Sequence, residues 1–315
     1  MFKIISVALL ILSVTAQASL AEIFPVKRCV NFANGLDAPF EGAWGYRIDD
    51  AHITSIAEDG FDTIRLPVRF QAGYTNGQIN PAMLDRVDHL IRVALAHDLN
   101  VVLDFHHFAE LMEDHNSHAD LFVDIWRELS AHYQGWSNKL MFELLNEPTD
   151  QVTTTRANAL YARVFPFLRD AHPKRWIIVG GGEWSSIAGL ADLAPNDEFT
   201  VHTFHYYDPF DFTHQTAEWV DLDLPKRGPP DTNEIARVES DFKALDDYPL
   251  PLFLGEFGVY NVVSPDERAL WMETVRRAAE KAGIGWCHWG YVSGFRLAED
   301  DLTWLPGLKE ALFSQ

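Results

Sequence analysis

The sequence predicts an α/β fold, a single (β/α)8 TIM barrel, from two alternating patterns. Short runs of consecutive apolar residues are typical of strands that are covered on both faces. Between them lie longer segments in which apolar residues recur at every third or fourth position, which indicates amphipathic helices. Eight such strand–helix units fit into about 290 residues, a usual size for a closed barrel. An open, doubly wound sheet is the alternative, and it is disfavoured because no glycine-rich phosphate turn follows the first strand.

The predicted strands are short apolar runs, most of which end in polar or aromatic residues. The second strand carries one charged side chain, Arg65, in an otherwise apolar setting. The eight predicted strands are residues 28–33, 61–68, 100–105, 139–145, 176–180, 199–206, 251–254 and 284–289.

The predicted helices are marked by apolar spacing together with start and stop residues. Gly60 follows the first helix, Pro81 opens the second, and Pro173 follows the fourth. The fifth has the weakest pattern, and a long loop rich in aromatic residues and proline, residues 208–231, precedes the sixth. The eight predicted helices are residues 48–59, 81–99, 121–133, 153–171, 185–191, 235–245, 266–282 and 308–313.

Residues 1–21 have the pattern of a secretory signal peptide. Lys3 precedes a short apolar run, and small residues allow cleavage after Ala18 or Ala21. An uncleaved anchor is the alternative, although the run is shorter than the roughly 20 apolar residues of a spanning helix. We therefore expect a secreted protein, periplasmic or extracellular, whose residues 22–315 form one catalytic barrel domain with no membrane contact after signal removal.

The charge and the cysteines limit the partners and the stabilising bonds. The formal net charge is −21, which argues against nucleic acid as a partner because phosphate binding requires clustered Lys and Arg. An acidic chain of this kind suits a neutral substrate. Cys29 and Cys287 are the two cysteines, and either one disulfide or two buried thiols agrees with the sequence.

Polar and aromatic residues end seven of the eight predicted strands. In a (β/α)8 barrel the functional groups lie at the carboxyl ends of the strands, so these residues are expected to converge. A single histidine or glutamate at a strand end is more often structural, but seven coincidences at one end indicate a functional site. The residues are Asn34, Asp37, Arg65, His106, His107, Asn146, Glu147, His205, Tyr207, Glu256 and Trp289.

Two of these residues, Glu147 and Glu256, form a candidate catalytic pair. They follow the fourth and seventh strands and would therefore face each other across the mouth of the barrel. Paired carboxylates suit glycosidic bond cleavage, in which one protonates the leaving oxygen and the other attacks the sugar or activates water. Arg65 beside Glu256 would keep that carboxylate ionised. Trp289 offers an apolar surface on which a sugar ring can stack.

The motifs at the strand ends resemble those of glycoside hydrolase family 5, which contains cellulases and related β-glycanases. They occur in family order and span nearly the whole mature chain: IRLP at 64–67, DFHH at 104–107, LNEP at 145–148, HYY at 205–207, LGEFG at 254–258 and Trp289. Residues 204–215 with Trp219 resemble the bacterial endoglucanase branch that also acts on mannan. Asp37, where that branch often carries Glu, and Cys29, where Gly is common, depart from the family pattern.

The resemblance implies a retaining endo-β-1,4-glucanase without cofactor or metal, monomeric, acting on soluble or amorphous β-1,4-glucan. Glu147 would be the general acid/base and Glu256 the nucleophile. Asn146 would bind the sugar 2-hydroxyl, Arg65 and Tyr207 would hold Glu256, and His205 would support Glu147. Sugar subsites would be lined by Asn34, Asp37, His106, His107, His214 and Trp219, with Trp289 stacking under a ring. An endo-β-1,4-mannanase or a dual glucanase and mannanase is the alternative.

Two other functions remain as rivals. A metal-dependent hydrolase on the same barrel would use the histidines at the strand ends, but adjacent strand residues such as His106 and His107 point to opposite faces. A non-catalytic carbohydrate-binding protein would be expected to lack one of Glu147, Glu256, Asn146 or Arg65, and all of these are present.

Overall fold

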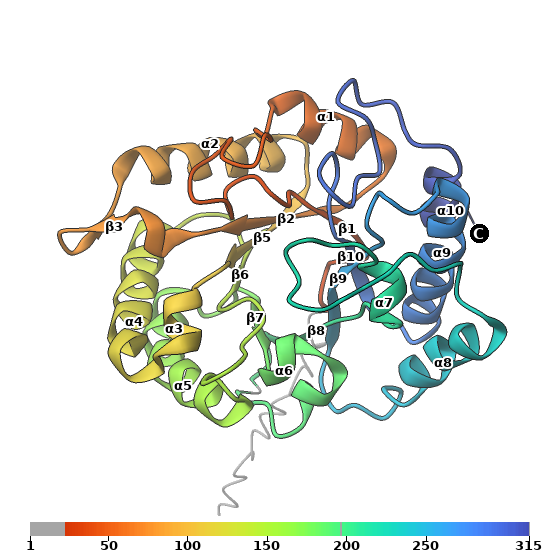
Figure 1. Ribbon diagram of the computed structural model, residues 1–315. Coiled ribbons are helices and arrows are strands. Elements are labelled where there is room, and N and C mark those ends of the chain that lie inside the picture. Colours follow the sequence, from red (N-terminus) through yellow and green to blue (C-terminus); the bar gives the residue numbers. More distant parts are fainter. Residues whose placement is uncertain (1–22, 196, 315) are drawn as a thin grey trace, which may run out of the picture.

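The computed structural model describes residues 23–195 and 197–314. It shows a closed barrel of eight parallel strands surrounded by helices, as predicted (Figure 1). The strands follow one another around the barrel in chain order, apart from a separate two-stranded hairpin. The predicted signal peptide, residues 1–21, lies outside the described residues. No helix within the described ranges is both long and apolar enough to cross a membrane.

The eight barrel strands coincide with the eight predicted ones and differ only at their ends. They are β1 (Arg28–Asn31), β2 (Thr63–Val68), β5 (Asn100–Phe105), β6 (Leu140–Glu143), β7 (Ile177–Gly180), β8 (Thr200–His205), β9 (Leu252–Phe257) and β10 (Gly285–His288). All of their residues are buried except the first of β1 and of β10, which are intermediate. Continuous burial explains why these strands read as unbroken apolar runs rather than alternating ones.

Helices surround the barrel, and several of the longer ones begin at a residue whose side chain caps them. Asp49 and Asp231 each form a capping box with the third residue of the following helix, and Asn80 caps a helix whose first residue is Pro81. The helices are α1 (Asp50–Asp59), α2 (Pro81–Ala96), α3 (Ala109–Glu113), α4 (His115–His132), α5 (Thr154–Ala171), α6 (Gly182–Ser185), α7 (Phe210–Thr213), α8 (Thr232–Lys243), α9 (Pro265–Lys281) and α10 (Leu308–Phe313).

Several local predictions were incomplete or wrong. The hairpin of β3 (Tyr74–Thr75) and β4 (Gln78–Ile79) was missed because two-residue strands leave no periodic pattern. The predicted helix 185–191 is wrong: α6 is followed by a 3-10 turn, Ile187–Leu190. Residues 183–185, which belong to α6, have left-handed backbone angles, so this short turn is not a regular right-handed helix and does not extend into one.

The interior of the barrel is filled at one end by an apolar layer. This layer includes Cys29, Val102, Met141, Ile178, Val201, Phe253 and Cys287. Cys29 and Cys287 lie opposite each other in the register of β1 and β10, and they form a disulfide. The pairing that the sequence left open is thus a bridge between the first and last strands of the barrel.

Candidate active site

A layer of polar side chains lies next to the apolar layer, one repeat further along the strands. Side chains of alternate strand residues share a face, so Asn31, Asp104 and Glu143 lie two positions after Cys29, Val102 and Met141, toward the carboxyl ends. The register pairs Asn31 with Arg65 and Asp104 with Glu143. The polar layer therefore forms the floor of the barrel mouth.

Arg65 is the centre of this floor, and its side chain is fully buried. Its Nε and Nη2 donate to the two carboxylate oxygens of Glu143 at 2.7 and 2.8 Å, and Asp104 lies 3.1 Å from Nη2. Its guanidinium also donates at 2.8 Å to Asn31, Asn146 and Glu256. A buried guanidinium is stable only when its donors are satisfied in this way, and the bidentate pair fixes its plane.

Glu147 and Glu256 lie on either side of His205. The His205 Nδ1 is hydrogen-bonded to Glu147 Oε1 at 2.8 Å and lies 3.6 Å from Glu256 Oε2. A carboxyl oxygen of Glu147, a ring nitrogen of His205 and a carboxyl oxygen of Glu256 all lie within 4.8 Å of one another. The Tyr207 hydroxyl donates to Glu256 Oε2 at 3.0 Å. The two carboxylates thus share His205 as a neighbour, whereas Tyr207 and Arg65 hydrogen-bond only to Glu256 of the pair.

The backbone is unusual beside both carboxylates, after the end of β6 and near the end of β9. Glu147 has a left-handed φ of 42°, an uncommon conformation for a residue other than glycine, and such residues concentrate at functional sites. At Gly255, an added Cβ would lie 2.6 Å from Thr203 Oγ1 and 2.9 Å from His205 Nε2. Glycine before Glu256 therefore allows His205 to pack directly against β9.

Burial dominates the ionisation of both carboxyl groups. It raises the pKa of Glu147 to about 7, although Arg65 opposes the shift. Burial also raises the pKa of Glu256 to about 7, against the lowering effects of His205 and Arg65. From the sequence we expected Arg65 to keep Glu256 ionised. The guanidinium does lower the pKa of Glu256, but the loss of water around the buried carboxylate outweighs this effect and the net shift is upward.

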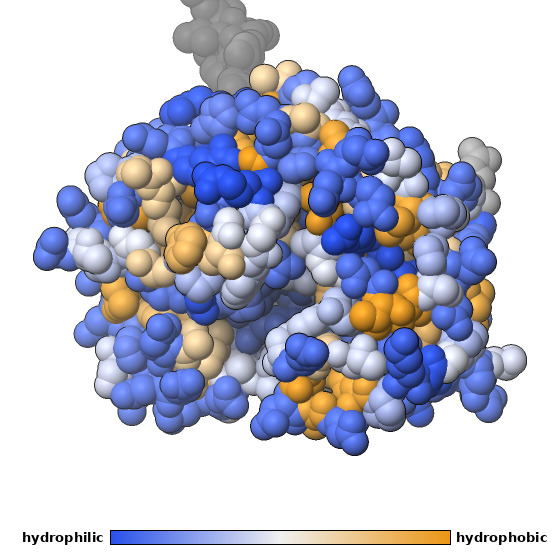
Figure 2. All heavy atoms as spheres, turned by 45° about the horizontal axis from the view of Figure 1, so that its top comes forward, coloured by the Kyte–Doolittle hydropathy of each residue, from blue (hydrophilic) through white to orange (hydrophobic). Residues whose placement is uncertain are grey.

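The residues predicted to bind substrate line one cleft of 790 Å³ above this floor. Figure 2 shows a hollow near the middle of this face of the molecule. Glu147, Tyr207 and Glu256 line the cleft. All seven residues predicted to bind substrate also line it: Asn34, Asp37, His106, His107, His214, Trp219 and Trp289. Arg65, Asn146 and His205 are not among the lining residues and support the site from below. A smaller hollow of 380 Å³ around Arg237 contains none of the predicted residues.

Aromatic rings give the cleft rigid walls. The ring of Trp289 stacks on that of His106, with centroids 5.4 Å apart. Trp219 is 57% exposed and meets Tyr260 edge to face at 4.7 Å, so one of its faces is open to solvent. His214 stacks on Phe210 at 4.1 Å. Flat apolar surfaces beside hydrogen-bonding groups are suited to sugar rings, which have both apolar faces and hydroxyl edges.

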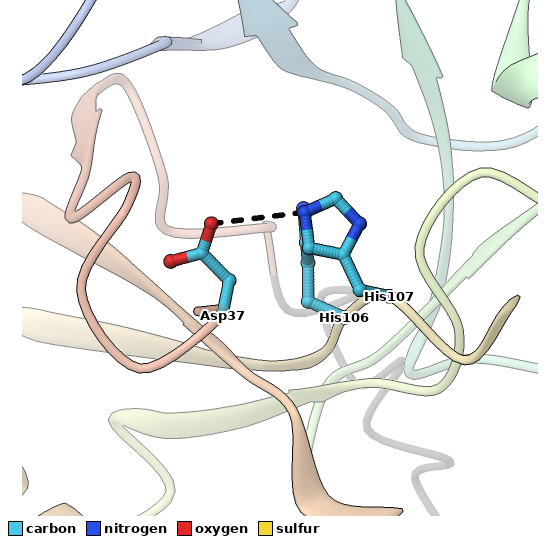
Figure 3. A group of neighbouring side chains, drawn as sticks. All are labelled: Asp37, His106 and His107. Carbon is cyan, nitrogen blue, oxygen red and sulfur yellow. Dashed lines mark ion pairs between the residues drawn. The ribbon is translucent and has the colours of Figure 1, made fainter. Parts of the chain in front are cut away.

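His106 and His107 do not point to opposite faces, contrary to the argument from strand alternation. Strand β5 ends at Phe105, and His107 has a left-handed φ of 54°, so alternation no longer applies. The two rings lie 4.2 Å apart and face the Asp37 carboxyl (Figure 3). Burial raises the pKa of Asp37 to about 7 and lowers that of His107 to about 2.

Sequence reasoning missed two sets of residues at this site. Asn31 and Glu143, which hold Arg65, are the last residues of β1 and β6. Side chains alternate along a strand, so this alternation could have predicted that both point into the barrel. The other set comes from loops and gives no periodic signal; it includes Trp44, Tyr46, Tyr260, Phe295, Arg296 and Asp300.

Comparisons with known proteins agree with this geometry. The sequence pattern of the family described as Cellulase (glycosyl hydrolase family 5) matches residues 30–293. Endoglucanase H of Acetivibrio thermocellus is 29% identical over 268 residues, which are 82% of this chain but only 29% of that longer protein. Endoglucanase C from the same organism is 29% identical over 289 residues, covering 78% of this chain and 84% of the relative.

A solved structure gives the same picture. Cel5A of Thermotoga maritima, solved with cellobiose and with mannotriose, is 33% and 32% identical in the two structures, with a TM-score of 0.88 in both. Each match covers 91% of this chain and 97% of the other. The chain therefore belongs to glycosyl hydrolase family 5, the cellulase family, and is a glycoside hydrolase.

Proposed function

We propose that this protein is a retaining endo-β-1,4-glucanase that cleaves internal bonds of soluble or amorphous β-glucans. The observation that carries the proposal is the spacing of Glu147 and Glu256, whose nearest carboxyl oxygens lie within 4.8 Å of each other. Retaining glycosidases place their carboxyl groups about 5–5.5 Å apart, whereas inverting enzymes need about 6.5–9.5 Å to admit a water molecule.

Glu147 is suited to the acid/base role. Its side chain is 28% exposed and opens to the cleft, whereas that of Glu256 is 5% exposed. With a pKa raised to about 7, Glu147 carries a proton that it can donate to the glycosidic oxygen near neutral pH. The hydrogen bond with His205 orients the Glu147 carboxyl group, which also has to accept a proton from water in the second step.

Glu256 is suited to the role of nucleophile. Arg65 holds one carboxyl oxygen and Tyr207 the other, so the group is fixed at the floor of the cleft. In the first step Glu256 bonds to the anomeric carbon while Glu147 protonates the departing oxygen. In the second, Glu147 takes a proton from water, which attacks the same carbon and releases Glu256.

The electrostatics of the pair support this change of role. The charge of Glu147 raises the pKa of Glu256, so the two carboxylates repel each other when both are ionised. Esterification of Glu256 removes its charge and the repulsion. The pKa of Glu147 then falls, and the group that acted as an acid becomes a better base.

The positions of the neighbouring residues support substrate roles for them. Asn146 lies just below the cleft lining; its Oδ1 accepts from Arg65, and its amide N–H remains as the donor proposed for the sugar 2-hydroxyl. The exposed ring of Trp219 and the ring of Trp289 offer stacking surfaces in the cleft. Endoglucanases among the relatives carry names consistent with a glucan substrate.

The stereochemistry of the first product tests the mechanism. Hydrolysis of a cellooligosaccharide followed by proton NMR should show the β-anomer first, with the α-anomer appearing only through mutarotation. Initial formation of the α-anomer would contradict the retaining assignment.

A mannanase or a dual-specificity enzyme is the second candidate. The structure of Thermotoga maritima Cel5A with mannotriose favours it, since that protein also has a cellobiose complex. Initial rates on carboxymethyl cellulose, barley β-glucan and glucomannan decide between the two. A rate on glucomannan that greatly exceeds the other two would replace the glucanase assignment.

Export and a monomeric state complete the proposal. The pattern of residues 1–21 supports secretion without a retained membrane segment. Amino-terminal sequencing of the exported protein, expected to begin after Ala18 or Ala21, tests the signal peptide, and light scattering tests the monomer.

A further inference from the structure

We propose that Asp37, His106 and His107 form a binding site for a divalent transition-metal ion such as Zn²⁺, and that the bound ion closes part of the cleft to substrate. The site itself is independent of the proposed function, whereas the inhibition rests on it. Figure 3 shows the three side chains, which come from the loop after β1 and from the end of β5.

The three side chains have the chemistry and the spacing of a metal site. One ligand atom from each lies within 4.8 Å of the others, and Asp37 Oδ2 is 3.8 Å from His107 Nε2. Ligands of tetrahedral Zn²⁺ at about 2.0–2.1 Å from the ion are about 3.4 Å apart, so adjustments of an ångström or so bring the three together. The His107 side chain is 40% exposed and has the freedom to make them.

Two features orient these ligands before any ion binds. The Nδ1 of His106 is hydrogen-bonded to Asp104 Oδ2 at 2.5 Å; when Asp104 is ionised it can only accept, so Nδ1 donates and the Nε2 lone pair is available. A carboxylate behind a histidine in this way is the usual support of a metal-binding imidazole. Asp37 is fully buried, and its Oδ1 has no hydrogen-bond partner among the described residues. A buried carboxylate oxygen that accepts no hydrogen bond is destabilised, and a bound cation would compensate it.

A second group, formed by Glu147, His205 and Glu256, has similar spacing but is less suited to a cation. The His205 Nδ1 is already engaged with Glu147 at 2.8 Å. The Arg65 guanidinium lies 2.8 Å from Glu256 and repels a second positive charge there. The positive charges of Arg69 and Arg65 also act on His106 and His107. There, however, Arg69 is hydrogen-bonded to the backbone oxygen of His107 at 3.3 Å, and Arg65 is neutralised by buried carboxylates.

The location of the site links metal binding to substrate binding. Asp37, His106 and His107 line the same cleft as Glu147 and Glu256. An ion with one or two bound waters would occupy the space beside Trp289, which a sugar ring needs under the proposed function. The ion and the polysaccharide would therefore exclude each other.

Zinc titration of the full mature protein by calorimetry tests the site without any activity measurement. The chain has no free cysteine thiol among the described residues to compete for the ion. We expect one strong equivalent of Zn²⁺, weakened at least tenfold in His107→Asn and in Asp37→Asn. Asparagine tolerates the left-handed backbone at 107, and circular dichroism checks that both variants fold.

Two control variants make the outcome decisive. His89→Asn removes a surface histidine paired with Asp50 at 2.7 Å and should leave the affinity unchanged. Glu256→Gln removes a ligand of the second group and should also leave it unchanged. Equal affinity in wild type and His107→Asn, or loss of binding in Glu256→Gln, would overturn the proposal.

Kinetics test the consequence for substrate. Zn²⁺ should raise KM for soluble β-glucan while kcat is unchanged, and chelation by EDTA should reverse the effect. Equal inhibition of wild type and His107→Asn would overturn the blocking role. A protein that binds Zn²⁺ at this site but hydrolyses no β-glucan would refute the proposed function and leave the metal site standing.

Discussion

Replacement of Glu143 by glutamine tests whether the buried ion network around Arg65 holds the active site together. The carboxylate of Glu143 accepts two hydrogen bonds from Arg65, at 2.7 and 2.8 Å, and both side chains are essentially inaccessible. Breaking a buried ion pair costs about 3–5 kcal/mol. Glutamine keeps one acceptor, removes the cost of burying a charge and leaves Arg65 paired with Asp104 and Glu256, so the expected loss in the free energy of unfolding is smaller, about 1–2 kcal/mol.

Urea denaturation followed by tryptophan fluorescence measures this loss, with an exposed ion pair as the control. Asp120 is 86% exposed and lies 2.5 Å from Arg163, so Asp120→Asn should leave the free energy of unfolding unchanged. If Glu143→Gln is as stable as Asp120→Asn, the reasoning is refuted, because the bidentate contact would then contribute nothing beyond a surface pair.

The same variant should also be less active. Arg65 donates to Asn146 and Glu256 as well as to Glu143, so loss of its main anchor lets the guanidinium shift. A displacement of about 1 Å at catalytic groups can lower kcat by about 100-fold. A fall in kcat at unchanged KM would identify Glu143 as a positioning residue. Unchanged kcat in a destabilised variant would limit its role to the fold.

Three further predictions concern the two carboxylates. Glu147→Gln and Glu256→Gln should each lower kcat on a soluble β-glucan by several orders of magnitude without a change in circular dichroism; near-normal turnover in either purified variant would contradict the assignment. Azide should rescue Glu256→Ala with formation of an α-glycosyl azide and Glu147→Ala with formation of the β-azide, both read by NMR, and the reverse pattern would exchange the two roles. Both groups have pKa values raised from 4.5 to about 7 in the folded state, so their contribution to stability is full below pH 4.5 and is lost as the pH rises through about 7. Thermal unfolding of wild type should therefore lose stability over this range more than that of Glu256→Gln, and parallel curves would show that Glu256 does not titrate as described.

Much of the fold and most of the site could be predicted because both depend on repeated local patterns. Buried parallel strands and amphipathic helices alternate along the chain, and the barrel brings the carboxyl ends of its strands to one face. That rule alone predicted that Glu147 and Glu256, which are far apart in sequence, lie close together in one cleft, as the structure shows. Segments without a repeat were not predictable in this way, such as the left-handed residues 183–185 and the two-residue strands of the β3–β4 hairpin.

The error about His106 and His107 has a different physical origin. The period of two holds only while the chain stays in extended backbone angles. One left-handed residue at the end of β5, His107, turns the second ring back toward the first. The point at which a strand ends is the least certain feature of a sequence pattern, and it is also where a barrel enzyme places its functional side chains. Predictions of which residues converge are therefore more secure than predictions of where each ring points.

The net sign of the Glu256 pKa shift could not be derived from sequence because it is a balance of burial and charge. The sequence indicated Arg65 as a neighbour, and the structure places its guanidinium 2.8 Å from the carboxylate. The same guanidinium also neutralises Glu143 and Asp104, so its charge is shared among three buried carboxylates. With one cation for three acids, desolvation prevails and the pKa rises to about 7. Arg65 thus orients Glu256 more than it ionises it, and ionisation near neutral pH is set by the whole polar layer.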